Sequence, residues 1–164
     1  AGAVGVSLSA QTCPHYLCLP AESLAPDSPA HACRPPVRSD ANRKALWSAL
    51  LARGSSITSV GSGHLPARGL YTLEWSLSAL WTASHRRGRD LRDLARWTSG
   101  APAELLGLGT KGRIAPGFDA DLVAFDPRAR VTVPATDPSP YAGRELTGRV
   151  RRVWVLGHGR GGAR

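Results

Sequence analysis

The sequence contains no methionine, only two lysines and no long hydrophobic run. A membrane-spanning helix needs about 18 consecutive apolar residues, and no segment approaches that length. The first ten residues carry no positive charge, which is not typical of a secretory signal peptide. A translated chain starts with methionine, so its absence even from position 1 leads us to expect a fragment or a trimmed product.

Cysteine is also scarce, and the three cysteines, Cys13, Cys18 and Cys33, cannot all pair with one another. Without a signal peptide, we expect a reducing, cytoplasmic location. Cys13 and Cys18 are too far apart in sequence for a Cys-x-x-Cys motif, and no second Cys/His pair completes a zinc knuckle. The pattern therefore predicts three free thiols that pack as small buried side chains.

Charge is unbalanced: 21 basic and 12 acidic residues give a net charge of +9, and all but two of the basic residues are arginine. A nucleic-acid surface would interleave basic with aromatic residues, and this pattern is missing, so nucleic acid is not favoured as a partner.

With 164 residues, 42% of them hydrophobic, the sequence is typical of about one globular domain.

Hydrophobic periodicity predicts alternating strands and helices in the first two thirds of the chain. Strands are expected over 4–8 and 57–60, and helices over 41–53, 70–85, 91–97 and a short segment ending near Gly107. Ser39 or Asp40 is expected to cap the first helix, and Asp90 the third. Five prolines in residues 20–38 predict a long irregular connection.

After Gly109 the sequence pattern changes from alternating strands and helices to strands without helices. Strands are expected over 122–125 and 150–156, paired with each other, while the proline-rich residues 127–141 are expected to wrap a surface. From Gly157 the chain is rich in Gly and Arg, and we expect a flexible tail. The predicted organisation is a layered α/β part (1–108), a return segment with part of a β-module (109–156) and a tail (157–164).

Three segments resemble the cyclic amidohydrolases. Residues 12–17 read TCPHYL, residues 33–38 read CRPPVR with Asn42-Arg43 following, and residues 111–123 read KGRIAPGFDADLV. They occur in the order of that family, and the resemblance covers almost the whole chain. Within the family the resemblance is closest to the allantoinases, with hydantoinases and dihydroorotases as relatives.

This resemblance implies an α/β fold: the C-terminal part of a metal-dependent (β/α)8 barrel, followed by the C-terminal strands of a small β-sandwich module. It also implies hydrolysis of a cyclic amide, allantoin to allantoate in purine catabolism, with a small cyclic ureide as substrate. Two divalent metals, usually zinc, would activate water. A whole barrel needs about 250 residues, so we expect this chain alone to be inactive and not to bind zinc tightly.

By resemblance, His15 is a metal ligand. Gly63 stands where the family has its catalytic aspartate, so we expect that no catalytic residue is retained. His64, next to it, is a weaker candidate for a metal ligand, and its alternative interpretation is an exposed loop histidine. The loop between His64 and the helix that holds Glu74 is shorter than in the family, which would open the pocket to water.

Cys33, Arg34 and Pro35 are candidate substrate-binding residues by the same resemblance. Arg34 occupies a position where the allantoinase pattern has a small residue. Its long side chain could crowd the ring pocket or extend outward.

Two other functions remain open. The chain could be a non-catalytic remnant that acts as an interaction module, or a basic module that binds a polyanion. Because much of the barrel is missing, exposed strand edges and apolar helix faces predict self-association.

Overall fold

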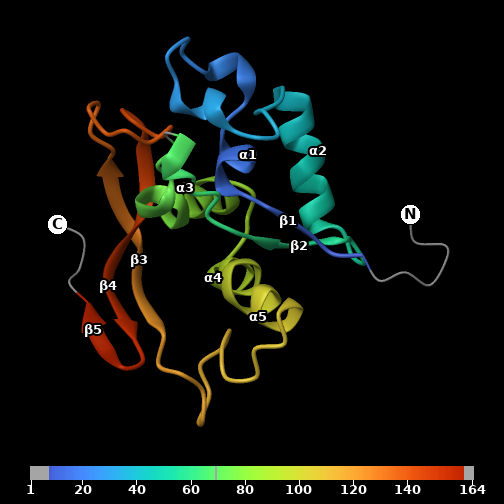
Figure 1. Cartoon of the computed structure of the whole chain (residues 1–164), viewed down its shortest axis with the longest axis vertical. Coiled ribbons are helices and arrows are strands. Elements are labelled where there is room, and N and C mark those ends of the chain that lie inside the picture. Colours follow the sequence, from blue (N-terminus) through green and yellow to red (C-terminus); the bar gives the residue numbers. More distant parts are fainter. Residues whose placement is uncertain (1–7, 69, 161–164) are drawn as a thin grey trace.

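The computed structural model describes residues 8–68 and 70–160, in which an α/β part is followed by an antiparallel sheet (Figure 1). In chain order the elements are β1 (Ala10–Thr12), α1 (Pro14–Cys18), η1 (Ala21–Ser23), η2 (Pro29–Ala32), α2 (Asp40–Leu51), β2 (Ile57–Val60), η3 (Pro66–Arg68), α3 (Leu73–His85), α4 (Leu91–Ala95), η4 (Arg96–Gly100), α5 (Ala101–Leu105), β3 (Leu122–Thr132), β4 (Glu145–Val155) and β5 (His158–Arg160). The α/β class expected from the sequence is confirmed.

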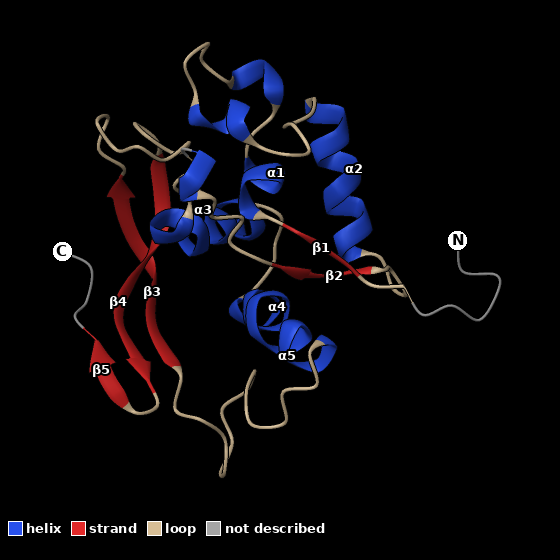
Figure 2. Cartoon of the chain, viewed as in Figure 1, coloured by secondary structure: helices blue, strands red, loops and turns tan. Residues whose placement is uncertain are grey.

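Two separate sheets organise these elements (Figure 2). β1 and β2 are parallel, with Thr12 opposite Val60, and the chain between them crosses over through α1 and α2. β3, β4 and β5 form an antiparallel meander, in which residues 122–126 pair with 149–154 as the sequence predicts. The parallel pair holds the two segments that resemble the catalytic motifs.

α2 forms where the sequence predicts it. The Ser39 hydroxyl accepts a hydrogen bond from the Asn42 N–H at 3.5 Å and caps the first turn. Trp47 and Leu50 face inward, and the Trp47 indole N–H donates to the Leu17 carbonyl at 2.8 Å. This bond fixes α2 against α1, the helix that follows β1.

The helices expected around 91–97 and before Gly107 are joined into one continuous helical run. Asp90 and Asp93 form a capping box at its start. Pro102 has no N–H, so regular α-helical hydrogen bonding cannot continue through it. The chain instead makes a π-helical turn, η4, in which the Ala101 N–H donates to the Arg96 carbonyl.

α3 lies between two hydrophobic clusters. The first gathers side chains from α1, α2, β2, α3 and the α4–η4 run: Leu17, Trp47, Leu50, Val60, Leu80, Trp81, Leu94 and Trp97. The second connects α3 to the long connection and the antiparallel sheet: Leu19, Ala30, Cys33, Leu70, Ala79, Val133, Tyr141 and Leu146. Leu73, which the helical periodicity of 70–85 predicts to face the core, is 62% exposed, because α3 begins there and its first turn projects from the core.

The antiparallel sheet is held closely against α3. The Trp81 and Phe125 rings meet edge to face, with centroids 6.2 Å apart. Thr82 Oγ1 accepts a hydrogen bond from the Thr147 N–H at 2.8 Å, while its own proton has the Ser78 carbonyl at 2.7 Å as its nearest acceptor. The helix thereby supplies a hydrogen-bond acceptor to the backbone of β4.

Three expectations for the chain ends and the late loop need correction. Of the strand expected over 4–8, residues 4–7 lie outside the described residues, and Leu8 precedes the strand, which begins at Ala10. Residues 127–141 do not simply wrap a surface, because β3 continues to Thr132 and the Tyr141 side chain is fully buried. Their prolines had suggested a loop, but the strand continues past a register irregularity between Asp126 and Arg130.

The tail expected from Gly157 is partly ordered, because residues 158–160 form β5 and pair with residues 153–155 of β4. Leu156 and Gly157 both have positive φ, 50° and 78°, as a tight hairpin turn requires. Leucine rarely adopts this conformation, so the sequence does not predict the hairpin.

Candidate metal and substrate site

The carboxyl ends of β1 and β2 bring the two motif segments together. β1 leads through Cys13 into α1, where Pro14 occupies the first turn and places His15 beside the strand end. β2 leads into residues 61–64, and the Gly61 N–H continues the parallel pairing by donating to the Thr12 carbonyl at 2.9 Å. Active sites of (β/α)8 barrels lie at this end of their strands.

Gly63 lies directly against the side chains of Cys13 and His15, which follow β1. Its φ is +65°, in the left-handed region that favours glycine. A β-carbon placed on Gly63 would lie 2.9 Å from Cys13 Sγ and closer still to His15 Cε1, nearer than real β-carbons approach. His15 and Gly63 are therefore neighbours, and Cys13 occupies part of the space that a side chain at position 63 would need.

His15 is a buried, neutral imidazole. It is 2% exposed, and its Nδ1 has no hydrogen-bond partner. Burial lowers its pKa to about 4, so the ring carries no charge at neutral pH. The Tyr16 ring covers it, with centroids 4.2 Å apart. A neutral imidazole with an unpartnered nitrogen is the form in which histidine binds metals.

His64 has a structural role that neither sequence-based interpretation includes. Its Nδ1 accepts hydrogen bonds from the backbone N–H groups of Thr72 at 3.1 Å and Leu73 at 3.4 Å, where α3 begins. These N–H groups have no partner within the helix, so the imidazole acts as a helix cap. His64 Nδ1 is not free to bind a metal, and the residue is half-buried rather than a free loop histidine.

The three candidate substrate-binding residues lie in different surroundings. Cys33 is fully buried in the second hydrophobic cluster. The Arg34 side chain is exposed and turns back to donate to the carbonyls of His31 at 3.2 Å and Cys33 at 2.9 Å. We expected the Arg34 side chain either to crowd the ring pocket or to extend outward, and in the structure it extends outward.

Pro35 is the member of this set that borders a cavity. Its carbonyl accepts a hydrogen bond from the Tyr16 hydroxyl at 2.6 Å, and both residues line a cavity of about 330 Å³ together with Arg38 and Asn42. The CRPPVR motif thus shapes a cavity on the α2 side of β1. His15 and Gly63 are not part of its lining.

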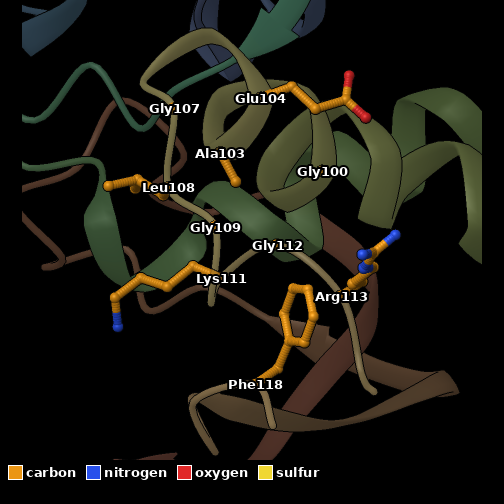
Figure 3. Close-up of a pocket in the computed structure, with 10 residues that line it drawn as sticks. All are labelled: Gly100, Ala103, Glu104, Gly107, Leu108, Gly109, Lys111, Gly112, Arg113 and Phe118. Atoms are coloured by element: carbon orange, nitrogen blue, oxygen red, sulfur yellow. The ribbon is translucent and has the colours of Figure 1, made fainter. Parts of the chain in front are cut away.

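A second cavity, of about 420 Å³, lies between α5 and the turn-rich segment 107–118 (Figure 3). Its polar side chains do not converge: the Glu104 carboxylate and the Lys111 ammonium point away from each other, and Arg113 lies over the Phe118 ring, 4.6 Å from its centroid. Lys111 instead pairs with Asp119 and Asp121. These ion pairs therefore stabilise the conformation of the KGRIAPGFDADLV segment, through which the chain returns to β3.

The donors near Gly63 do not fit a two-metal centre. Within residues 8–68 and 70–160, no three His, Cys, Asp or Glu side chains lie close enough together to hold a metal ion. Gly63 offers no side-chain donor, and His64 Nδ1 already accepts the hydrogen bonds that cap α3.

In the same described ranges, no helix is long and apolar enough to cross a membrane.

Sequence reasoning missed the place of Cys13 in this arrangement. We expected a small buried side chain, but it is only partly buried and lies with His15 at Gly63. Its position two residues before His15, directly after a strand, was the available signal. The three thiols are free, as expected.

Known proteins similar to the chain are mostly longer enzymes. It is 37% identical to the allantoinase of Streptomyces avermitilis over 96% of its own length and 39% of that protein, and 32% identical to the allantoinase of Arabidopsis thaliana over 94% of its length and 35% of that protein. The crystal structure of dihydropyrimidinase from Brevibacillus agri matches 92% of the chain and 38% of its own, with a TM-score of 0.79 and 31% identity.

The chain thus spans between 35% and 39% of the length of these proteins. The alignment with the Streptomyces protein runs over 179 positions, more than the 164 residues of the chain, so that relative contains residues that this chain lacks. The model of the amidohydrolase family matches residues 5–159. This range includes the TCPHYL segment, the loop that contains Gly63 and the antiparallel sheet. The chain therefore belongs to the amidohydrolase family.

Proposed function

We propose that this chain is the C-terminal part of an allantoinase-like enzyme, which opens the cyclic amide of allantoin only when the rest of a barrel is present. The observation that carries the proposal is the meeting of His15 and Gly63 at the carboxyl ends of β1 and β2. The similarity to allantoinases over almost the whole chain supports the same substrate class.

Within a complete barrel, His15 would hold a metal through its neutral imidazole. Divalent metals in such sites, when bound, lower the pKa of a bound water and polarise the carbonyl that it attacks. The Tyr16 ring and the burial of His15 orient the imidazole and keep water from it. In this chain, zinc is the metal that the family suggests.

The step that this chain does not support is proton transfer to the leaving amide nitrogen. Gly63 has no side chain that could carry a proton, and general acid–base catalysis typically contributes about 10²–10⁴-fold in rate. The isolated chain also contributes one metal ligand where several are needed. We therefore propose that the chain by itself does not hydrolyse allantoin.

The test follows allantoate formation by the purified chain with zinc or manganese added. We expect no turnover by the unmodified chain or by Gly63→Asp, because the second change restores a carboxylate but not the missing metal ligands. Turnover that is abolished by His15→Ala would overturn this proposal and would require a metal site that the described residues do not reveal.

A chimera separates the fragment from the inactive remnant. This chain would replace the matching segment of the Streptomyces avermitilis allantoinase, with either Gly63 or Gly63→Asp. If the chain is a catalytic part that lacks its proton carrier, the chimera with Gly63→Asp regains activity by about 10²–10⁴-fold. If both chimeras fold and neither is active, the non-catalytic interaction module is the better description.

A further inference from the structure

We propose that β3 is the docking edge for a second copy of this chain, and that the two β3 strands pair antiparallel across a twofold axis at Val123. The strand order of the sheet is β3-β4-β5, so no described strand pairs with β3 on the side away from β4. β3 is 11 residues long, whereas strands commonly have about 5–6. A long edge strand presents unpaired N–H and C=O groups to which another chain can add a strand. The inference does not depend on the hydrolase function.

The backbone groups of Val123 point toward this open edge. Directly before β3, the Ala120 carbonyl accepts a hydrogen bond from the Gly157 N–H at 3.0 Å, on the side of β4. Successive residues of an antiparallel strand direct their N–H and C=O groups alternately to one side and the other, so those of Asp121 and Val123 face away from β4. Two β3 strands that are antiparallel to each other can therefore exchange both hydrogen bonds between their Val123 residues.

The Val123 side chain is also open to solvent beside this edge. It is 52% exposed and, with Leu122 and Phe125, lines an apolar groove next to β3. With the axis at Val123, the two valines lie directly opposite each other, and Asp121 of one copy lies opposite Phe125 of the other. Cross-strand pairs of β-branched residues stabilise antiparallel sheets. Docking would therefore cover an apolar side chain that the isolated chain leaves in water.

Pro127 limits the length of the shared ladder. Proline has no N–H to donate, which confines it within sheets to edge strands and bulges. Its carbonyl accepts a hydrogen bond from the Trp81 indole N–H at 3.0 Å, so that carbonyl is already used within the chain. The ladder between the two copies thus spans residues 121–125 of each.

The charges along β3 point to a second copy as the partner and to the antiparallel orientation. Asp119 and Asp121 directly precede the strand, whereas Arg128 and Arg130 lie in its second half. Lys111 pairs with both carboxylates, so it offsets only one of their two negative charges. Neither arginine forms an ion pair within residues 8–68 and 70–160. Antiparallel pairing brings the acidic end of each strand beside the basic end of the other, while parallel pairing would place carboxylates together.

A residue on a twofold axis meets its own copy, which gives the proposal a specific test. Val123→Cys is oxidised in solution, and disulfide-linked dimers are measured on a non-reducing gel. In a hydrogen-bonded antiparallel pair the α-carbons are about 5.5 Å apart, within the range that a disulfide spans. We expect Val123→Cys to cross-link at least tenfold faster than the parent, whose three free thiols set the background. Peptide mass spectrometry should locate the bond between the two residues 123.

The matched control is Val155→Cys, because Val155 is another exposed valine of the same sheet and lies on β4, away from the axis. It should cross-link no faster than the parent. In a second measurement, Val123→Pro removes the N–H that faces the open edge and should weaken association at least tenfold in sedimentation velocity. Circular dichroism checks that this variant folds, and the cross-linking result stands without it.

Three outcomes would show that the proposal is wrong. They are cross-linking of Val123→Cys no faster than of Val155→Cys, a disulfide that joins residue 123 to a different position, and association of a folded Val123→Pro variant as tight as that of the parent. None of these measurements involves allantoin hydrolysis, so the docking edge and the enzymatic function can fail independently.

Discussion

At position 63, glycine both permits a backbone conformation and leaves room for two neighbours. Its φ of +65° suits glycine, and its missing β-carbon lets His15 and Cys13 approach the chain. Restoring a side chain there therefore has a conformational cost and a steric cost. This is why a change to aspartate, even in a complete barrel, would require His15 and Cys13 to shift.

Gly63→Ala tests these two costs, and Gly54→Ala separates them. Gly54 has a similar φ of +70°, but a β-carbon there would meet nothing within 4 Å. We expect Gly54→Ala to lower the free energy of unfolding by about 1 kcal/mol and Gly63→Ala by about 2–4 kcal/mol. Urea denaturation of both variants measures the difference, and equal losses would show that the crowding at Gly63 is relieved without cost.

The cysteines should differ in how fast they react with iodoacetamide. Burial raises the pKa of Cys18 to about 12 and that of Cys33 to about 11, so at pH 8 almost none of either thiol is ionised. Below its pKa, the thiolate fraction of each group rises tenfold per pH unit, so its alkylation rate should rise with pH. We expect Cys13 to react first, as measured by peptide mass spectrometry between pH 7 and 10. Faster labelling of Cys18 at pH 8 would contradict the buried environment.

At the scale of residues, the sequence predicted the site only where neighbours in space follow from strand order. His15 and Gly63 each follow a strand of one parallel pair, so their meeting could be anticipated. The cap formed by His64 depends on how close its imidazole comes to the Thr72 N–H, eight residues later, which no local pattern encodes. Cys33 is buried because Tyr141 and Val133, more than 90 residues later, pack in the same cluster.

Among the helices, the start of α3 depends on a side chain from outside it. Thr72, at the N-cap position, makes no side-chain capping bond, and its hydroxyl donates instead to the Ser62 carbonyl at 2.9 Å. His64 therefore satisfies N–H groups that would otherwise lack a partner. The residue after Gly63 thus connects the loop that follows β2 to α3.

Removing this cap should weaken α3. We expect His64→Ala to lower the free energy of unfolding by about 0.5–2 kcal/mol, the range measured for helix caps. His64→Asn, which can accept the same hydrogen bonds, should recover part of the loss. Urea denaturation measures both, with His158→Ala on exposed β5 as the control. A His64→Ala variant as stable as the parent would show that water replaces the imidazole without cost.

The elements that the sequence predicted best are those whose own residues determine them. α2 and α3 carry clear helical periodicity, and Ser39 and Asp90 cap helices as expected. The π-helical turn η4 joins two predicted helices just before Pro102, whose missing N–H interrupts the regular α-helical bonding, and hydrophobic periodicity does not predict that the helical run continues. β5 exists because Leu156 adopts a positive φ, and a leucine gives no signal of that in sequence.

The whole molecule exposes an apolar groove between the α4–α5 helices, the return segment and β3. The groove has a volume of about 820 Å³, and Leu77, Leu94, Leu122 and Phe125 are among its lining residues. At its rim Ile114 is 89% exposed and Leu106 is 70% exposed. Large exposed apolar patches are uncommon in monomers and mark association surfaces.

We therefore expect the chain to self-associate in a concentration-dependent way. Sedimentation velocity should detect species larger than a monomer at micromolar concentrations, and Ile114→Asp should weaken association at least tenfold. Leu156→Asn removes a similar exposed apolar side chain outside the groove and should change little. A monodisperse monomer at all concentrations would contradict the prediction and favour a chain that needs no partner.

The hydrogen bond between Thr82 and Thr147 also bears on the edge of the antiparallel sheet. β4 pairs with β3 along most of its length, but β5 covers only residues 153–155 on its other side, which leaves the earlier β4 residues with one neighbouring strand. Unpaired strand edges are templates on which another chain can add a strand. The Thr82 hydroxyl already accepts the hydrogen bond of the Thr147 N–H, so a strand arriving at this edge would have to displace α3 before it could pair with that group. The packing of α3 against β4 thus shields part of the sheet edge from another strand.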